Sequence, residues 1–173
     1  MILIAIKVVF VALLSLAAIS DARRFLIPNL YPACLILLAI AAWFAGFPFT
    51  PPLWSHLAHF AIALVVGMAL FHFGWFGGGD VKLYAAVALW FGLSNGIFLL
   101  FVTGISGAAI VVLSVLWRVL RTAFGRGGGT KGGLMKRRIA YGVAVAAGGI
   151  VAMLWIYPVS STPHPFQPIS LTR

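Results

Sequence analysis

Six apolar runs, separated by short segments rich in glycine, proline or basic residues, constrain the fold of this chain more than any other feature. A helix needs about 20 apolar residues to cross the hydrocarbon core of a membrane. With 63% hydrophobic and 8% charged residues, the composition lies far outside that of soluble domains. The sequence therefore predicts an all-α, polytopic membrane bundle of about six transmembrane helices, over residues 1–20, 30–46, 56–76, 81–95, 97–117 and 139–157.

The fourth run is the shortest. Residues 81–95 would form a helix of about 22 Å at 1.5 Å per residue, less than the core thickness of about 30 Å. We therefore expect this helix to be recessed in the bundle. The first run resembles a signal peptide in length, but no basic segment precedes it and Arg23 and Arg24 follow it. We expect it to be retained as a membrane helix.

The distribution of basic side chains predicts the orientation. With the N-terminus outside, ten of the twelve Lys and Arg residues fall on the cytoplasmic side. Residues 1–158 are expected to form one membrane-embedded domain with a basic, glycine-rich cytoplasmic loop at 118–138, and residues 159–173 an irregular outer tail. The net charge of +10 fits contact with anionic lipid better than nucleic-acid binding, which we do not expect.

Only two side chains carry a carboxylate, Asp21 and Asp80, where average composition would give roughly 20 acidic residues. Asp21 follows the first apolar run and Asp80 precedes the fourth, so the alternation of spans places both on the cytoplasmic side. Ionisable residues at such positions are functional candidates. Two simpler alternatives exist: Asp80 could cap a helix beginning at Val81, and Asp21 could pair with Arg23 or Arg24.

Two carboxylates that share one proton can hydrolyse a peptide bond without a metal or cofactor. The ionised member takes a proton from water, and the protonated member donates to the carbonyl oxygen. Gly77, Gly78 and Gly79 precede Asp80; without side chains they would let a substrate backbone come close and adopt positive φ. Lys82 could hold a carboxylate ionised or extend to the membrane surface.

Three segments, in the same order, resemble the type IV prepilin peptidases, which are GxGD-type membrane aspartyl peptidases. Gly77-Gly78-Gly79-Asp80-Val81-Lys82-Leu83 resembles the GxGD signature. The segment from Asp21 to Asn29 resembles an aspartate followed by an Ile-Pro-Asn turn. Residues 140–148 resemble a closing Pro-Tyr-Gly-Val-Ala-Ile-Ala segment, with Ala140 at the place of the proline.

The resemblance implies a peptidase of the bacterial plasma membrane that removes a short basic leader from prepilins or pseudopilins at the cytoplasmic face. It implies Asp21 and Asp80 as the catalytic pair. The implied reaction requires no cofactor or metal. The sequence leaves open whether copies of the chain form a homo-oligomer. The residues expected to shape the site or bind substrate are Gly77, Gly78, Gly79, Lys82, Pro28, Asn29, Tyr141 and Gly142.

The chain resembles the short form of the family, associated with Flp-type tight-adherence pili. Long members carry paired CxxC motifs after the first span and also N-methylate the cleaved pilin. Here only eight residues separate Asp21 from Leu30, and Cys34 is the one cysteine. We therefore expect peptidase activity without methyltransferase activity.

Four other functions compete with this interpretation, and one of them is a structural or assembly protein of the membrane. A small transporter or channel could use Asp21 and Asp80 as proton or cation sites. A serine intramembrane protease could use Ser106 of a GxSG string, but the only later histidine is His164 in the outer tail. A metalloprotease is disfavoured because His56 and His59 lack an HExxH pattern, and interfacial packing is the expected role of both.

Overall fold

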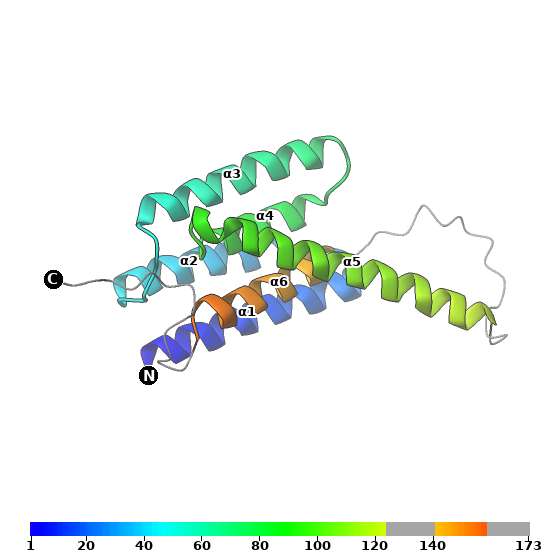
Figure 1. The fold of residues 1–173 in the computed structure, drawn as a ribbon, viewed down its shortest axis with the longest axis horizontal. Coiled ribbons are helices and arrows are strands. Elements are labelled where there is room, and N and C mark those ends of the chain that lie inside the picture. Colours follow the sequence, from blue (N-terminus) through cyan, green and yellow to red (C-terminus); the bar gives the residue numbers. More distant parts are fainter. Residues whose placement is uncertain (124–140, 159–173) are drawn as a thin grey trace.

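The computed structural model describes residues 1–123 and 141–158. These two ranges contain six helices and no strand. Consecutive helices run in opposite directions, so the loops gather at two ends of the bundle (Figure 1). This confirms the predicted all-α fold. The helices are α1 (Ile2–Arg24), α2 (Leu30–Phe44), α3 (Leu53–His72), α4 (Gly78–Ala88), α5 (Leu93–Ala123) and α6 (Tyr141–Ile156).

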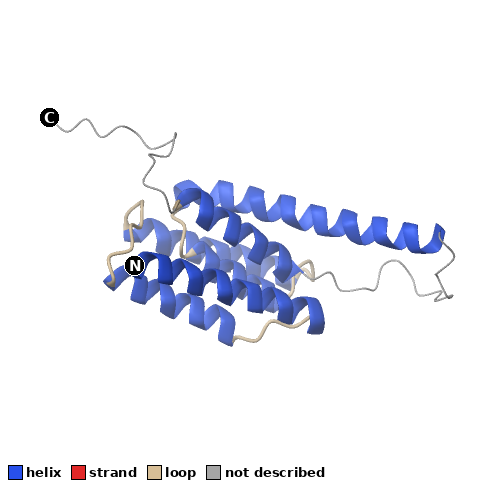
Figure 2. Cartoon of the chain, turned by 90° about the horizontal axis from the view of Figure 1, so that it is seen from below, coloured by secondary structure: helices blue, strands red, loops and turns tan. Residues whose placement is uncertain are grey.

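Three helices are long and apolar enough to cross a membrane: α1, α3 and the Leu93–Trp117 part of α5. Helices α2 and α6 are shorter apolar helices. Helix α5 has 31 residues and extends beyond the end of the bundle (Figure 2). It continues to Ala123 and so enters the segment 118–138, which we had predicted to be a loop. Residues 124–140 and the tail 159–173 lie outside the described residues.

Helix α4 is shorter than predicted and lies inside the bundle, in contact with α2, α3 and α6. Instead of covering 81–95, it begins at Gly78 and ends at Ala88, and α5 begins at Leu93 rather than at residue 97. A helix surrounded by other helices does not have to match the membrane thickness, because protein rather than lipid covers its ends.

The turn between α4 and α5 explains the wrong boundary. Trp90 and Phe91 are fully buried in this turn, and Trp90 Nε1 donates a hydrogen bond to the Leu35 carbonyl oxygen at 3.2 Å. Tyr157 Oη donates to the Trp90 carbonyl oxygen, also at 3.2 Å. These residues are apolar because they lie in the protein core, whereas hydropathy alone assigns them to a span facing lipid.

Two histidines of α3 form hydrogen bonds with the backbone of this turn. His56 Nδ1 lies 3.0 Å from the Leu89 carbonyl oxygen, and His56 Nε2 lies 3.0 Å from that of Pro51. His59 Nδ1 lies 2.6 Å from the Phe91 carbonyl oxygen. Both side chains are buried, and their partners are backbone carbonyl groups of the α4–α5 turn (Leu89 and Phe91) and of the loop before α3 (Pro51). They therefore have a structural role in the core of the bundle, whereas the sequence predicted packing at the membrane interface.

The cation within the first span has a local explanation. Lys7 Nζ donates to the Tyr157 carbonyl oxygen at 2.8 Å and to that of Pro158 at 3.3 Å. These carbonyl groups follow the C-terminal end of α6, where unpaired oxygens and the helix dipole favour a positive charge. Lys7 therefore joins the beginning of α1 to the end of α6.

The close packing of α5 on α6 gives a testable prediction. A Cβ atom added to Gly148 would lie 2.8 Å from Thr103 Cα and 3.0 Å from Thr103 Cβ. Overpacking of this kind costs about 1–3 kcal/mol, so we expect Gly148→Ala to lower the thermal unfolding temperature in detergent. Gly104→Ala is the matched control, because no atom lies within 4 Å of its added Cβ. Equal unfolding temperatures for the two variants would contradict the described packing.

Candidate active site

Asp21 lies in the last turn of α1 and is 5% exposed. The helix continues past this residue to Arg24, and Phe25 then adopts a left-handed conformation with φ of 51°. Its backbone N–H donates to the Asp21 carbonyl oxygen at 2.8 Å, which ends the helix. Arg23 and Arg24 are exposed, and neither forms an ion pair with Asp21 in the described part of the chain. The surface ion-pair alternative is therefore wrong.

Asp80 lies in the first turn of α4 and is 8% exposed. It is the third residue of this helix, whose N-cap is Gly77, so the alternative in which Asp80 is the N-cap of a helix beginning at Val81 is wrong. The carboxylate folds back toward the start of the helix, where the Gly77 amide stabilises it. A side chain at this position can satisfy an unpaired backbone N–H of the first turn. The Asp80 carboxylate therefore stabilises the first turn of α4 through the Gly77 amide.

The two carboxylates meet at the beginning of α6. The backbone amide of Gly142 stabilises the ionised forms of both Asp21 and Asp80, and the Val143 amide adds to this at Asp21. A Cβ on Gly142 would lie 2.8 Å from Asp21 Oδ2 and would also clash with the Ile27 side chain. Only glycine lets the carboxylate approach the backbone this closely. The backbone amide of Gly142, one of the predicted site residues, therefore contacts both carboxylates.

The electrostatics of Asp80 follow from this placement. Burial, followed by the neighbouring charge of Asp21, raises the pKa of Asp80 to about 6. The Gly77 and Gly142 amides oppose the shift because they stabilise the ionised form. One oxygen of each carboxylate, Asp21 Oδ2 and Asp80 Oδ1, is buried without a hydrogen-bond partner among the described residues. Buried oxygens of this kind normally have a partner.

The expectation that the glycine run adopts positive φ is wrong, and the structure shows what the absence of side chains accommodates there. A Cβ on Gly77 would lie 2.6 Å from Asp80 Oδ2, and a Cβ on Gly79 would lie 3.1 Å from Ile27 Cβ. Gly78 packs against the ring of Phe71. None of the three adopts a positive φ, which among the glycines of the described ranges occurs at Gly46 and Gly74. The run makes room for the carboxylate of Asp80 and for the loop after α1.

Lys82 joins that loop to α4. Its Nζ donates to Asn29 Oδ1 at 3.1 Å, at an exposed position, and the charge of Lys82 is not among the causes that shift the pKa of Asp80. Asn29 is also the N-cap of α2, and the Pro28 carbonyl oxygen accepts a bond from the Tyr31 N–H at 3.2 Å. Pro28, Asn29 and Lys82 therefore hold the loop that carries Ile27.

Tyr141 begins α6 and stacks on Phe76, with ring centroids 5.1 Å apart and an interplanar angle of 22°. This stack stands beside the carboxylates, because Gly77 follows Phe76 and Gly142 follows Tyr141. Sequence analysis missed Phe76 and Ile27, which are ordinary apolar residues next to motif positions. The described residues contain no group of three His, Cys, Asp or Glu side chains that could hold a metal ion.

Comparison with known proteins identifies a family for this chain. A profile of the type IV leader peptidase family matches residues 8–112. The chain is 32% identical over 157 residues to a "Prepilin leader peptidase/N-methyltransferase" of Bacillus subtilis (strain 168), with 86% of this chain and 54% of that protein covered. The chain thus spans about half the length of this curated relative. No solved structure matches.

Because the pKa of Asp80 is raised, replacing this residue by a neutral side chain should stabilise the fold by an amount that depends on pH. Ionising Asp80 requires more free energy in the folded than in the unfolded chain. The resulting loss in the free energy of unfolding grows as pH rises from about 4 to about 6. We therefore expect Asp80→Asn to raise the unfolding temperature in detergent at pH 7.5, by an amount that shrinks as pH falls toward 4. A loss of stability of equal size at both pH values would instead indicate that Asp80 serves only to hold the helix start.

Proposed function

The chain belongs to the type IV leader peptidase family, and we propose that it is a membrane aspartyl endopeptidase that removes the leader of prepilin-like precursors. The observation that supports this most strongly is the meeting of Asp21 and Asp80 at the Gly142 amide. These are the two acidic side chains of the whole chain, and both are buried. Burying two carboxylates side by side is costly, and such arrangements cluster at functional sites.

The proposed reaction uses the two unpartnered oxygens. A water bound at Asp21 Oδ2 loses a proton to the Asp21 carboxylate while its oxygen attacks the scissile carbonyl carbon. Asp80 donates its proton to the carbonyl oxygen, which gives a neutral gem-diol. The C–N bond then breaks: Asp21 gives its proton to the leaving nitrogen, and a gem-diol hydroxyl returns a proton to Asp80. The pair ends with one proton, as it began.

In the singly protonated form of the pair that this reaction uses, we assign the proton to Asp80, because burial and the charge of Asp21 raise its pKa to about 6. The two residues act as a unit, since ionising one makes the ionisation of the other harder. Tyr141, Gly142 and the glycine run then shape the site around the scissile bond. Pro28, Asn29 and Lys82 hold the loop that packs beneath the run.

The finer parts of the proposal come from the sequence. The basic residues favour an active site on the cytoplasmic side of the bacterial plasma membrane. The segment between Asp21 and Leu30 has no room for the paired CxxC motifs of long family members. We therefore propose Flp-type prepilins as substrates, with cleavage and no N-methylation of the product.

Co-expression with a Flp-type prepilin tests the pair. We expect wild type to cut, and both Asp21→Asn and Asp80→Asn to be inactive at equal membrane levels, because Asn keeps the size but cannot ionise. Ser106→Ala is the control and should cut like wild type. The mass of the product, with S-adenosylmethionine added to purified protein, should show cleavage without a methyl group. Normal cleavage by either Asn variant would instead favour the transporter alternative.

Gly142→Ala tests the close approach to α6. The added methyl group would displace the Asp21 carboxylate and Ile27, and a displacement of about 1 Å can cost about 100-fold in rate. We expect a loss of at least that size in kcat. Gly148→Ala is the matched control, since it overpacks the same helix away from the carboxylates. If both variants lost activity only in proportion to stability, the close approach would have no catalytic role.

A further inference from the structure

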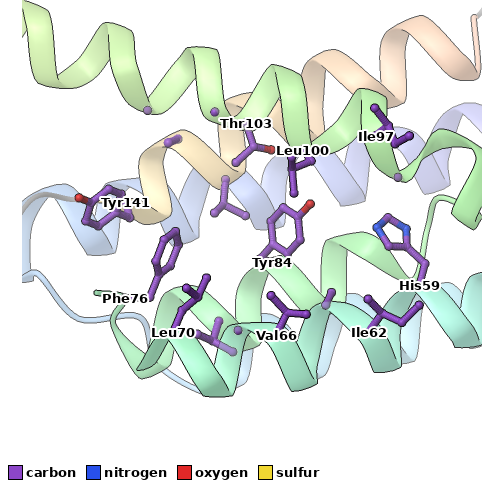
Figure 3. Close-up of a pocket in the computed structure, with 18 of the residues that line it drawn as sticks. His59, Ile62, Val66, Leu70, Phe76, Tyr84, Ile97, Leu100, Thr103 and Tyr141 are labelled. Atoms are coloured by element: carbon purple, nitrogen blue, oxygen red, sulfur yellow. The ribbon is translucent and has the colours of Figure 1, made fainter. Parts of the chain in front are cut away.

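A cavity of about 590 Å³ opens along one side of the bundle, between α3 and α5, with α4 and α6 behind it. Figure 3 shows Tyr141 and Phe76 at one end of this groove and His59 and Ile97 at the other. Asp21 and Asp80 do not line it, but their neighbours do: Val81 follows Asp80, and Tyr141 precedes Gly142. The groove therefore ends beside the carboxylates, at the stacked Phe76 and Tyr141 rings.

The length of the groove matches that of a membrane. Its wall on α5 runs from Leu93 to Val111, which is about 27 Å at 1.5 Å per residue. This is close to the hydrocarbon thickness of about 30 Å. An occupant that fills the groove along its length thus reaches from the carboxylates to the opposite end of the bundle.

The α5 wall of the groove is built from small side chains at helical spacing. Thr103, Gly104, Gly107 and Ala108 all line it, within two turns of α5. No atom lies within 4 Å of a Cβ placed on Gly104, so the space in front of this residue is open. Small residues in membrane helices let a second helix backbone approach closely. A wall of this kind suits a helix better than the loosely packed chain of a lipid.

We propose that this groove binds the apolar helix of the precursor, so that the helix lies between α3 and α5 with its N-terminal end at the carboxylates. The inference rests on the proposed function, because it assigns the substrate's apolar segment to a surface beside the reacting site. Continuity with the carboxylates favours this occupant over a lipid chain or a second copy of the protein, neither of which has to end there. The lining, chiefly apolar, adds affinity through packing along the helix.

A groove-filling variant separates docking from catalysis. Two synthetic substrates share a basic leader and cleavage site, but only one continues into an apolar helix of about 20 residues. We expect Gly104→Leu to reduce kcat/KM for the helix-bearing substrate at least tenfold more than for the short peptide. Ala109→Leu is the matched control; Ala109 is an exposed residue of α5 that does not line the groove. It should leave the ratio of the two rates unchanged.

Equal effects of Gly104→Leu on both substrates, or no effect on either, would overturn the groove assignment while leaving the peptidase proposal intact. If wild type cut neither substrate, the peptidase proposal itself would fail. Disulfide crosslinking tests independently whether the substrate helix binds in the groove. In a Cys34→Ala background, Gly104→Cys should form a disulfide with a cysteine placed in the substrate helix, whereas Ala109→Cys should not. Equal crosslinking at both positions, or none at Gly104→Cys, would overturn the groove assignment.

Discussion

The approach of two carboxylates to the backbone amide at the start of α6 is the interaction on which the rest of this structure depends. Gly142 permits it, because any side chain there would occupy the space of the Asp21 carboxylate and of Ile27. The end of α1, the start of α4 and the start of α6 meet at this point, which the antiparallel arrangement of consecutive helices brings to one end of the bundle (Figure 1). Two helix N-termini, with their partial positive charge, offset part of the cost of burying both acids.

The short helix α4 makes this arrangement possible within a membrane protein. Because α2, α3 and α6 surround it, α4 needs only 11 residues, and its first turn can carry an acid inside the bundle. The turn that follows is held by Trp90 and by the two histidines of α3. The first turn of α4 therefore carries a site residue, while the turn that follows its last residue is fixed to α2 and α3. The groove between α3 and α5 ends beside the site, at Phe76 and Tyr141.

The sequence predicted the parts of this account that depend on composition and on motif order. The rarity of acids singled out Asp21 and Asp80, and the apolar runs predicted an all-α membrane bundle. The boundaries of α4 could not be predicted, because hydropathy does not distinguish a residue buried in protein, such as Trp90, from one facing lipid. The close contacts of the glycine run could not be predicted either, because Ile27 approaches Gly79 only when the loop after α1 folds back onto α4. The groove depends on the spacing of α3 and α5, which no local pattern encodes.

Infrared titration of the protonated carboxyl stretch tests the coupling of the two aspartates most directly. The chain suits this measurement because Asp21 and Asp80 are its two acidic side chains, and a terminal carboxyl titrates near pH 3.3. The account predicts a protonated carboxyl that is lost with a midpoint of about pH 6 and is absent in Asp80→Asn. In Asp21→Asn the midpoint should fall, because the neighbouring charge is gone. A midpoint near pH 4 in wild type, or one that Asp21→Asn leaves unchanged, would contradict a coupled pair.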